Sequence, residues 1–187
     1  MIAICIGHSR KIKGRYDGGA YSPWLKINER DFNLEVATEL TKHLANNGIP
    51  SRVISDYKGG GYGYAMQDAA DQVKAMKASI AIELHFNSAS PSANGHEWLY
   101  WHSSEAGRAI AEAFRGQFGK GHPNMTDRAT KGITAQMRGG SFLRLTNCPS
   151  VLLEPFFGSS ESDCQKITAK SVAKSYAKAL ISIVSDL

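Results

Sequence analysis

The stretch Ile80-Ala-Ile-Glu-Leu-His-Phe86 is almost continuously apolar. Side chains along a strand point alternately to the two faces of its sheet, so this run predicts a strand over residues 79–86 that is buried on both faces. Burial on both faces is typical of a parallel sheet with helices on either side. Shorter apolar runs over 2–6 and 150–154 predict two further strands of that sheet.

Segments with a helical period alternate with these strands. An apolar residue recurs every fourth position from Phe32 to Leu44, which indicates one buried helix face. Asn28 can cap the start of this helix, and Asn47-Gly48 stops it. We expect further helices over 65–77, 105–118 and 163–184, further strands over 52–55 and 97–101, and mostly loop over 9–27 and 119–140.

Length and composition fit one globular domain. The chain has 187 residues, of which 42% are hydrophobic and 21% are charged, and these values exclude a disordered or collagen-like chain. The alternating pattern predicts the α/β class: a single domain over 1–187, with a twisted, mainly parallel sheet flanked by helices. Such sheets bind ligands beyond the carboxyl ends of their strands.

The charge balance favours an anionic partner. The net charge is +5 and the isoelectric point is about 9.1. Lysines and arginines are spread along the chain without the runs of a nucleic-acid-binding arm, so we expect no nucleic-acid partner. No stretch approaches the length of a membrane span, and we expect no membrane insertion. A monomer is favoured, although the sequence does not decide the oligomeric state.

The cysteines favour a reducing compartment. Cys5, Cys148 and Cys164 are odd in number and lack C-x-x-C spacing, which argues against a disulfide framework and a cysteine zinc site. The N-terminus has no basic n-region, and its apolar stretch is too short for a signal peptide, so we expect a cytoplasmic location. Cys148 is better explained as a buried structural thiol than as a nucleophile.

Four titratable residues stand where the strands end. His8, His85 and Glu154 follow or close apolar strands, and Glu29 opens the helix after the first strand. Each alone has an ordinary explanation, such as a core histidine or a helix N-terminal charge. Glu154 is harder to dismiss, because a carboxylate among apolar neighbours needs a partner, a metal or a proton. We expect all four at one edge of the sheet.

Two histidines and one glutamate form a donor set known from catalytic zinc sites, with water as the fourth ligand. A further carboxylate nearby could take the proton of that water and pass it to a leaving amine. Glu154 fits this role. Glu83 is the competitor: it lies two residues before His85, so it points to the same face but deeper in the sheet. A structural salt bridge is the alternative role for Glu83.

Five segments, in order, resemble the zinc-dependent N-acetylmuramoyl-L-alanine amidases of the type-3 amidase family, which includes phage endolysins. They are Ile4-Cys-Ile-Gly-His8-Ser, Asp17-Gly-Gly-Ala20, Asn28-Glu29-Arg-Asp31, Glu83-Leu-His85-Phe-Asn87 and Pro149-Ser-Val-Leu-Leu-Glu154-Pro-Phe-Phe157. Gly-His alone is a weak signal, but the ordered set is strong and covers residues 4–157.

The resemblance implies the chemistry of the site. It implies Zn²⁺ held by His8, Glu29 and His85, with Glu154 as the catalytic carboxylate. It further implies peptidoglycan as substrate, cut at the amide between N-acetylmuramic acid and L-alanine. The chain departs from the family pattern after Gly7-His8 and over 138–147, so the substrate-binding residues stay unassigned.

The resemblance also suggests a biological role. Without an export signal, the chain fits a phage or prophage lysin stored in the host cytoplasm and acting on the wall after release. We expect no separate wall-binding domain, and the positive charge could draw the enzyme to anionic wall polymers. The alternatives are a zinc carboxypeptidase or peptidase acting on stem peptides, and a non-catalytic wall-binding module.

Other polar and aromatic residues have ordinary explanations. The run Trp98-Leu-Tyr-Trp101 is better explained as a packed strand than as a sugar platform. Spare ligand candidates that we expect to face solvent are His96, His102 and His122. Arginines that could pair with stem-peptide carboxylates, but are more simply solvated, are Arg128, Arg138 and Arg144.

Overall fold

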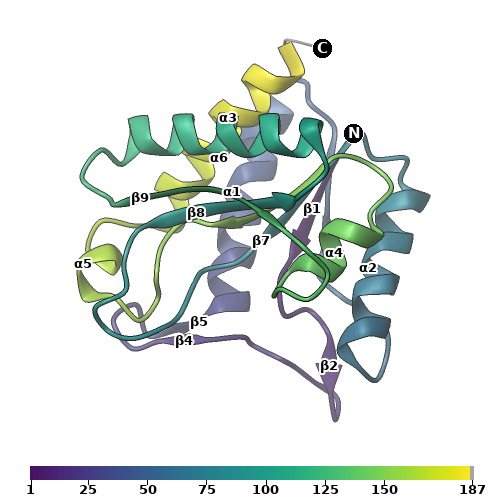
Figure 1. The fold of residues 1–187 in the computed structure, drawn as a ribbon, viewed down its shortest axis with the longest axis horizontal. Coiled ribbons are helices and arrows are strands. Elements are labelled where there is room, and N and C mark those ends of the chain that lie inside the picture. Colours follow the sequence, from purple (N-terminus) through teal and green to yellow (C-terminus); the bar gives the residue numbers. More distant parts are fainter. Residues whose placement is uncertain (186–187) are drawn as a thin grey trace.

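The computed structural model describes residues 1–185, in which six strands form one central sheet (Figure 1). Their spatial order is β6 (Ser51–Ile54), β1 (Ile2–Ile6), β7 (Ile80–Leu84), β10 (Ser150–Glu154), β8 (His96–Trp101) and β9 (Asp127–Ile133). The apolar run over residues 80–86 therefore contains a central strand, β7, and all five residues of β7 are buried.

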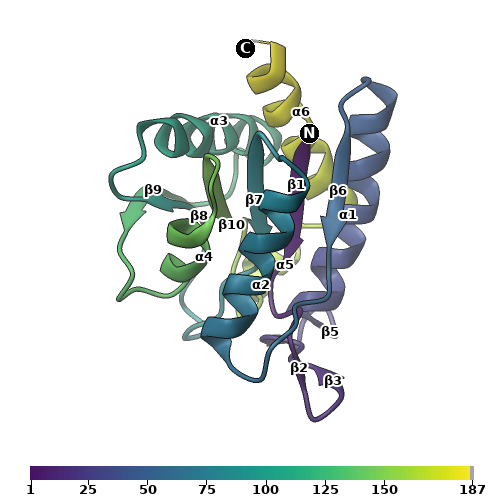
Figure 2. The same cartoon turned by 90° about the vertical axis from the view of Figure 1, so that its right-hand side faces the viewer.

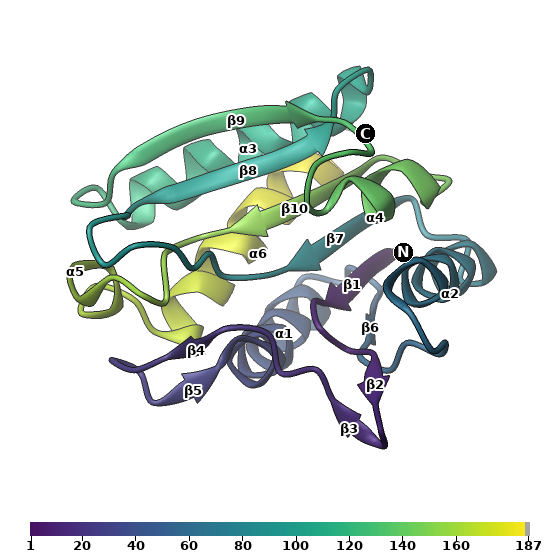
Figure 3. The same ribbon diagram turned by 60° about the horizontal axis from the view of Figure 1, so that its bottom comes forward.

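The sheet is mainly parallel, as predicted. β6, β1, β7 and β10 run in the same direction. β8 pairs with β10 in the antiparallel sense, and β9 is parallel to β8, so these two strands run the other way (Figure 3). The carboxyl ends of β1, β7 and β10 consequently meet at one edge of the sheet.

Helices cover both faces of the sheet (Figure 2). Their bounds are α1 (Glu29–Asn46), α2 (Tyr62–Ala75), α3 (Glu105–Gly121), α4 (Gly140–Leu145), α5 (Glu161–Cys164) and α6 (Ala169–Ser185). On one face, α1, α3 and α6 pack on the larger apolar cluster, which contains Ile4, Ile82 and Leu153. On the other face, α2 and α4 pack on a smaller cluster around Cys5 and Leu152.

Several parts of the chain differ from the sequence prediction. Residues 119–140 were expected to be mostly loop, but they contain β9, an edge strand held by its pairing with β8. The closing helix over 163–184 is interrupted, because Ser160 caps α5 and the hydroxyl of Thr168 accepts a hydrogen bond from Ser171 N–H (3.1 Å) at the start of α6.

The predicted loop over 9–27 carries short strand pairs. These are β2 (Lys11–Ile12) with β3 (Arg15–Tyr16), and β4 (Tyr21–Ser22) with β5 (Ile27–Asn28). They extend from the carboxyl edge of β1 and lead directly into α1 (Figure 3). Across residues 1–185, the helices are all too short or too polar to cross a membrane.

Candidate active site

A cleft of about 880 Å³ opens at the carboxyl ends of β1, β7 and β10. Its walls come from the turns that follow these strands, from α2 and from the segment leading into α4. The four residues that the sequence singled out all line it: His8, Glu29, His85 and Glu154. The cleft lies where ligands bind in open α/β sheets.

His8 follows β1 in an unusual backbone conformation. Its φ is 60°, in the left-handed region that a bulky residue rarely adopts. Nε2 of its ring lies 3.3 Å from Oε2 of Glu29, and Nδ1 lies 3.5 Å from Oδ2 of Asp17. Such backbone strain concentrates at functional sites, because it aims a side chain that ordinary geometry would not.

His85 follows β7 and lies over the backbone of the neighbouring strand. The register pairs Ile6 with Leu84, so Gly7 comes directly beside His85. A Cβ atom at Gly7 would lie 2.3 Å from Cε1 of the His85 ring, and only glycine permits this approach. Burial would lower the pKa of His85, but the carboxylates of Glu83 and Glu29 outweigh it and raise this pKa well above its ordinary value.

Glu29 is the first residue of α1, and its side chain is buried. The backbone N–H of Phe86 donates to Oε1 and that of Ala20 donates to Oε2, both at 3.1 Å, so the two oxygens are fixed. Nδ1 of His85 lies 2.8 Å from Oε1. Burial would raise the pKa of Glu29, but its contacts with His8 and His85 lower it below the ordinary range. Glu29 is therefore charged at neutral pH.

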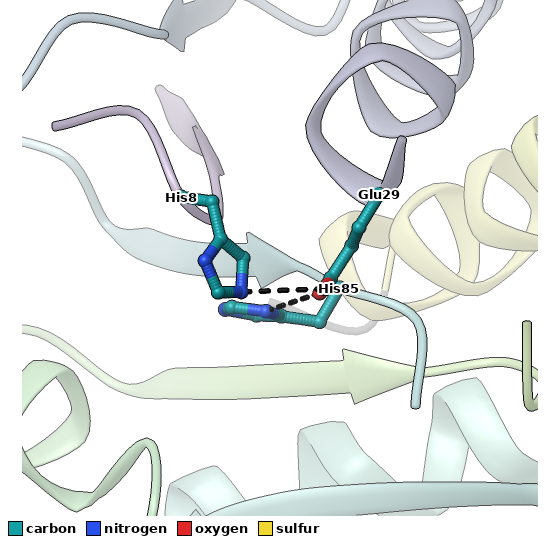
Figure 4. A group of neighbouring side chains, drawn as sticks. All are labelled: His8, Glu29 and His85. Atoms are coloured by element: carbon teal, nitrogen blue, oxygen red, sulfur yellow. Dashed lines mark hydrogen bonds and ion pairs between the residues drawn. The ribbon is translucent and has the colours of Figure 1, made fainter. Parts of the chain in front are cut away.

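These three side chains form a group with the geometry of a metal site (Figure 4). One ligand atom from each of His8, Glu29 and His85 lies within 4.8 Å of the others. Three elements distant in sequence bring them together, as the sequence predicted. Two imidazole nitrogens and a carboxylate oxygen are a donor set that suits first-row metals, and the open cleft leaves room for a further ligand.

Glu154 lies at the end of β10, beside His85 in the sheet. The backbone N–H of His85 donates to the carbonyl of Leu153 (3.1 Å), which fixes this alignment. Oε2 of Glu154 is buried, and no donor to it is found among residues 1–185. Burial raises the pKa of Glu154 to about 8; the charge of His85 opposes this rise and the carboxylate of Glu29 adds to it. A carboxyl group of this kind exchanges its proton near neutral pH.

Another buried carboxylate, Glu97, lies directly opposite Glu154 on β8. It accepts hydrogen bonds from Arg128 Nε (2.9 Å), Lys131 Nζ (2.5 Å) and Asn87 Nδ2 (3.0 Å). Burial would raise the pKa of Glu97, but Lys131 and Arg128 lower it instead. The sequence did not single out Glu97, since its two cationic partners lie on the strand that was expected to be loop.

The remaining candidates fall into two groups. His102, Arg138 and Arg144 are exposed, as expected, and Arg138 lies at the rim of the cleft. The expectation of solvent-facing rings was wrong for His96 and His122, which are 1% and 8% exposed. Both pack on Phe118, so apolar and aromatic contacts compensate for their burial.

The structure agrees with the predictions for Trp98, in a packed strand, and for Cys148, a structural thiol. Trp98 is fully buried, in agreement with a packed strand. Cys148 is half-buried beside the smaller cluster, and burial raises the pKa of its thiol to about 11. A thiol that stays protonated at neutral pH is a poor nucleophile.

Comparison with known proteins identifies the family. A family model described as N-acetylmuramoyl-L-alanine amidase matches residues 2–186. Among curated proteins, none matches the sequence significantly. The fold is similar to the amidase AmiC2 of Nostoc punctiforme, with 20% identity, a TM-score of 0.80, and coverage of 99% of this chain and 97% of that one.

Two catalytic domains are similar to the same degree. That of the amidase CwlV from Bacillus (Paenibacillus) polymyxa var. colistinus has 22% identity and a TM-score of 0.79, with 98% of both chains covered. That of an endolysin targeting Clostridia difficile has 20% identity and a TM-score of 0.78, with 97% of this chain and 96% of that one covered. At such identities the structures establish the fold, and the family model establishes the activity. The chain therefore belongs to the N-acetylmuramoyl-L-alanine amidase family, the peptidoglycan hydrolases that its sequence resembles.

Proposed function

We propose that this amidase is zinc-dependent and cuts the bond between the lactyl group of N-acetylmuramic acid and L-alanine of the stem peptide. One observation supports the proposal above all. The ligand atoms of His8, Glu29 and His85 lie within 4.8 Å of one another in a cleft that Glu154 also lines. Three protein ligands with an open fourth position are typical of catalytic zinc rather than structural zinc.

The residues present fit a zinc ion. Glu29 is already charged and both of its oxygens are held by backbone N–H groups, so its position requires no rearrangement. Gly19, with a φ of 71°, leaves space beside it, since a Cβ atom there would lie 2.7 Å from Oε2 of Glu29. A zinc ion held by these residues would polarise the scissile carbonyl and lower the pKa of a water molecule toward about 7.

Glu154 supplies the proton transfers in this proposal. Its carboxylate, whose Oε2 has no donor among residues 1–185, takes a proton from the attacking water and then delivers it to the nitrogen of the leaving alanine amine. A pKa of about 8 suits both proton transfers, because the carboxyl group can gain and lose a proton near neutral pH. Glu97 is less suited, because hydrogen bonds from two cationic side chains occupy it.

Mass spectrometry of muropeptides tests the proposal. Purified peptidoglycan digested with the zinc-loaded protein should release peptides with a free L-alanine amino terminus and leave the glycan strands intact. A chelator should abolish the reaction, and Zn²⁺ should restore it. Cleavage within the stem peptide would instead identify a peptidase, and release of reducing sugar without a new alanine amine would identify a glycosidase.

The biological role is a further part of the proposal. We infer a phage or prophage lysin that acts on the wall after release, with its net charge of +5 contributing to wall affinity. Attraction between exposed charges is screened beyond about 8 Å at physiological salt. Sedimentation with purified cell walls should therefore weaken as salt rises, and salt-independent binding would contradict the electrostatic part of this role.

A further inference from the structure

Each histidine of the metal group has a carboxylate at both of its ring nitrogens. One nitrogen faces Glu29: Nε2 of His8 at 3.3 Å and Nδ1 of His85 at 2.8 Å. The other nitrogen faces an outer carboxylate. Nδ1 of His8 lies 3.5 Å from Asp17, and Nε2 of His85 lies 3.5 Å from Glu83. Histidines that bind a metal commonly donate their second N–H to such a carboxylate, which fixes the tautomer and the ring orientation.

The two outer carboxylates differ in their surroundings. The side chain of Asp17 is 24% exposed and also accepts a hydrogen bond from Arg10 Nε (3.1 Å), so its charge is shared with solvent and with a cation. The side chain of Glu83 is 3% exposed. Within residues 1–185, no ion pair of Glu83 other than that with His85 is found. Removing one partner of a buried ion pair is strongly destabilising, because the other partner is left as an uncompensated buried charge.

The position of Glu83 follows from the sheet. Glu83 and His85 are two residues apart on β7 and point to the same face, which carries α2 and α4. Cys5 and Leu152 are its neighbours on the adjoining strands. Glu83 therefore approaches His85 from inside the sheet, on the side away from Glu29. This placement separates it from the edge at which Glu29 and His8 meet.

We propose that Glu83 is a positioning residue: it accepts the Nε2 proton of His85 and thereby leaves Nδ1 free to bind the metal. This inference rests on the metal site of the proposed function. It assigns Glu83 to the support of a ligand rather than to proton transfer, which was the competing role. Loss of such an outer partner typically costs about 10–100-fold in metal affinity.

Zinc affinity measured by competition with a chromophoric chelator tests the assignment. Glu83→Leu removes the acceptor at similar volume and should weaken Zn²⁺ binding about 10–100-fold. Glu83→Gln keeps a neutral acceptor and should weaken it less. The matched control is Glu97→Gln, a buried carboxylate of the same cleft that contacts neither histidine, and it should retain the wild-type affinity.

The outcomes separate the possible roles. A structural Glu83 would lower the melting temperature of the metal-free variants and leave zinc affinity unchanged, and a general base would lower turnover at saturating zinc with unchanged affinity; either result overturns the assignment. Failure of the wild-type protein to bind zinc would instead overturn the proposed metal site itself.

The wild-type protein provides a second test that does not depend on folding of a variant. With Zn²⁺ bound, two-bond ¹H–¹⁵N correlation spectra should place the single ring proton of His85 on Nε2 and show an unprotonated Nδ1 whose resonance is shifted from its position in the metal-free protein. In the zinc-loaded protein, a proton on Nδ1, or zinc binding through Nε2, would contradict the assignment even if every variant failed to fold.

Discussion

Two pairs of histidines lie in this molecule, one in the cleft and one in the core. His8 and His85 each contact the carboxylate of Glu29. His96 and His122 are packed against the ring of Phe118. The pKa of His85 is raised by its carboxylates despite burial, whereas burial lowers the pKa of both core histidines. Burial alone therefore does not indicate what a histidine does.

The hydrogen-bond partners explain the difference. In the core, Trp98 Nε1 donates to Nδ1 of His96 (3.0 Å), and Ser171 lies 3.1 Å from Nε2 of His122, so each ring is hydrogen-bonded to an uncharged group. In the cleft, negative oxygens converge on the rings. A cation placed among those oxygens and nitrogens would be stabilised there, whereas the carboxylate nearest the core pair, Asp127, lies 3.9 Å from His96 Nδ1 and is paired with Arg115.

The largest expected effect comes from removing a cleft histidine. His85→Ala should lose bound zinc and reduce amidase turnover to background, because two remaining protein ligands hold zinc poorly. His96→Asn, which keeps an acceptor near the position of Nδ1, should bind one zinc per chain and hydrolyse peptidoglycan as the wild type does. Elemental analysis and turnover on the same preparations measure both. Full zinc in His85→Ala would disprove the ligand assignment.

The next effect concerns the carboxylate beside the histidines. Glu154→Gln preserves shape but cannot accept a proton at neutral pH, so turnover per zinc-loaded molecule should fall about 10²–10⁴-fold. Because Oε2 is buried without a donor among residues 1–185, we expect no loss in the melting temperature. Near-normal turnover with full zinc would remove Glu154 from the mechanism.

The sequence predicted those parts of the fold that apolar patterning controls. β7, β1 and β10 are mostly apolar runs, and the parallel pairing of β7 with the other two brings the ends of all three strands to one edge. The positions of His8, His85 and Glu154 follow from that geometry. Glu29 could be placed because it opens the first helix after β1, although residues 7–28 and their short strand pairs separate the two elements.

Elements that depend on tertiary partners were not predicted. β9 reads Asp-Arg-Ala-Thr-Lys-Gly-Ile, in which only Ile133 is fully buried, so it lacks the alternation of a strand. Its pairing with β8 and its contacts with Glu97 stabilise it instead. The burial of His96 likewise depends on Trp98. The spacing of four between Phe118 and His122 at the end of α3 was a signal that could have revealed their stacking.

The smallest expected effect is a dependence of stability on pH that comes from the core. Burial lowers the pKa of His96, and the charged or titratable groups around it are Asp127, Arg115, His122 and Asp163. Unfolded histidine has a pKa of about 6.5, so below that value the unfolded chain binds a proton that the folded core does not. This contribution of His96 is thus fully present above about pH 6.5 and is lost as pH falls toward the lowered folded pKa.

The core and cleft contributions can be separated by difference. Urea unfolding of metal-free wild type and metal-free His96→Asn, between pH 7.5 and pH 5, leaves the cleft histidines the same in both proteins, so their titration cancels. The free energy of unfolding of the wild type should fall more steeply with decreasing pH, by about 1.4 kcal/mol for each unit by which the His96 pKa is lowered. His122→Asn should remove a similar contribution, since burial lowers its pKa as well. Parallel pH profiles for wild type and His96→Asn would mean that the His96 ring is protonated in the folded core, and the contrast between the two pairs of histidines would then be wrong.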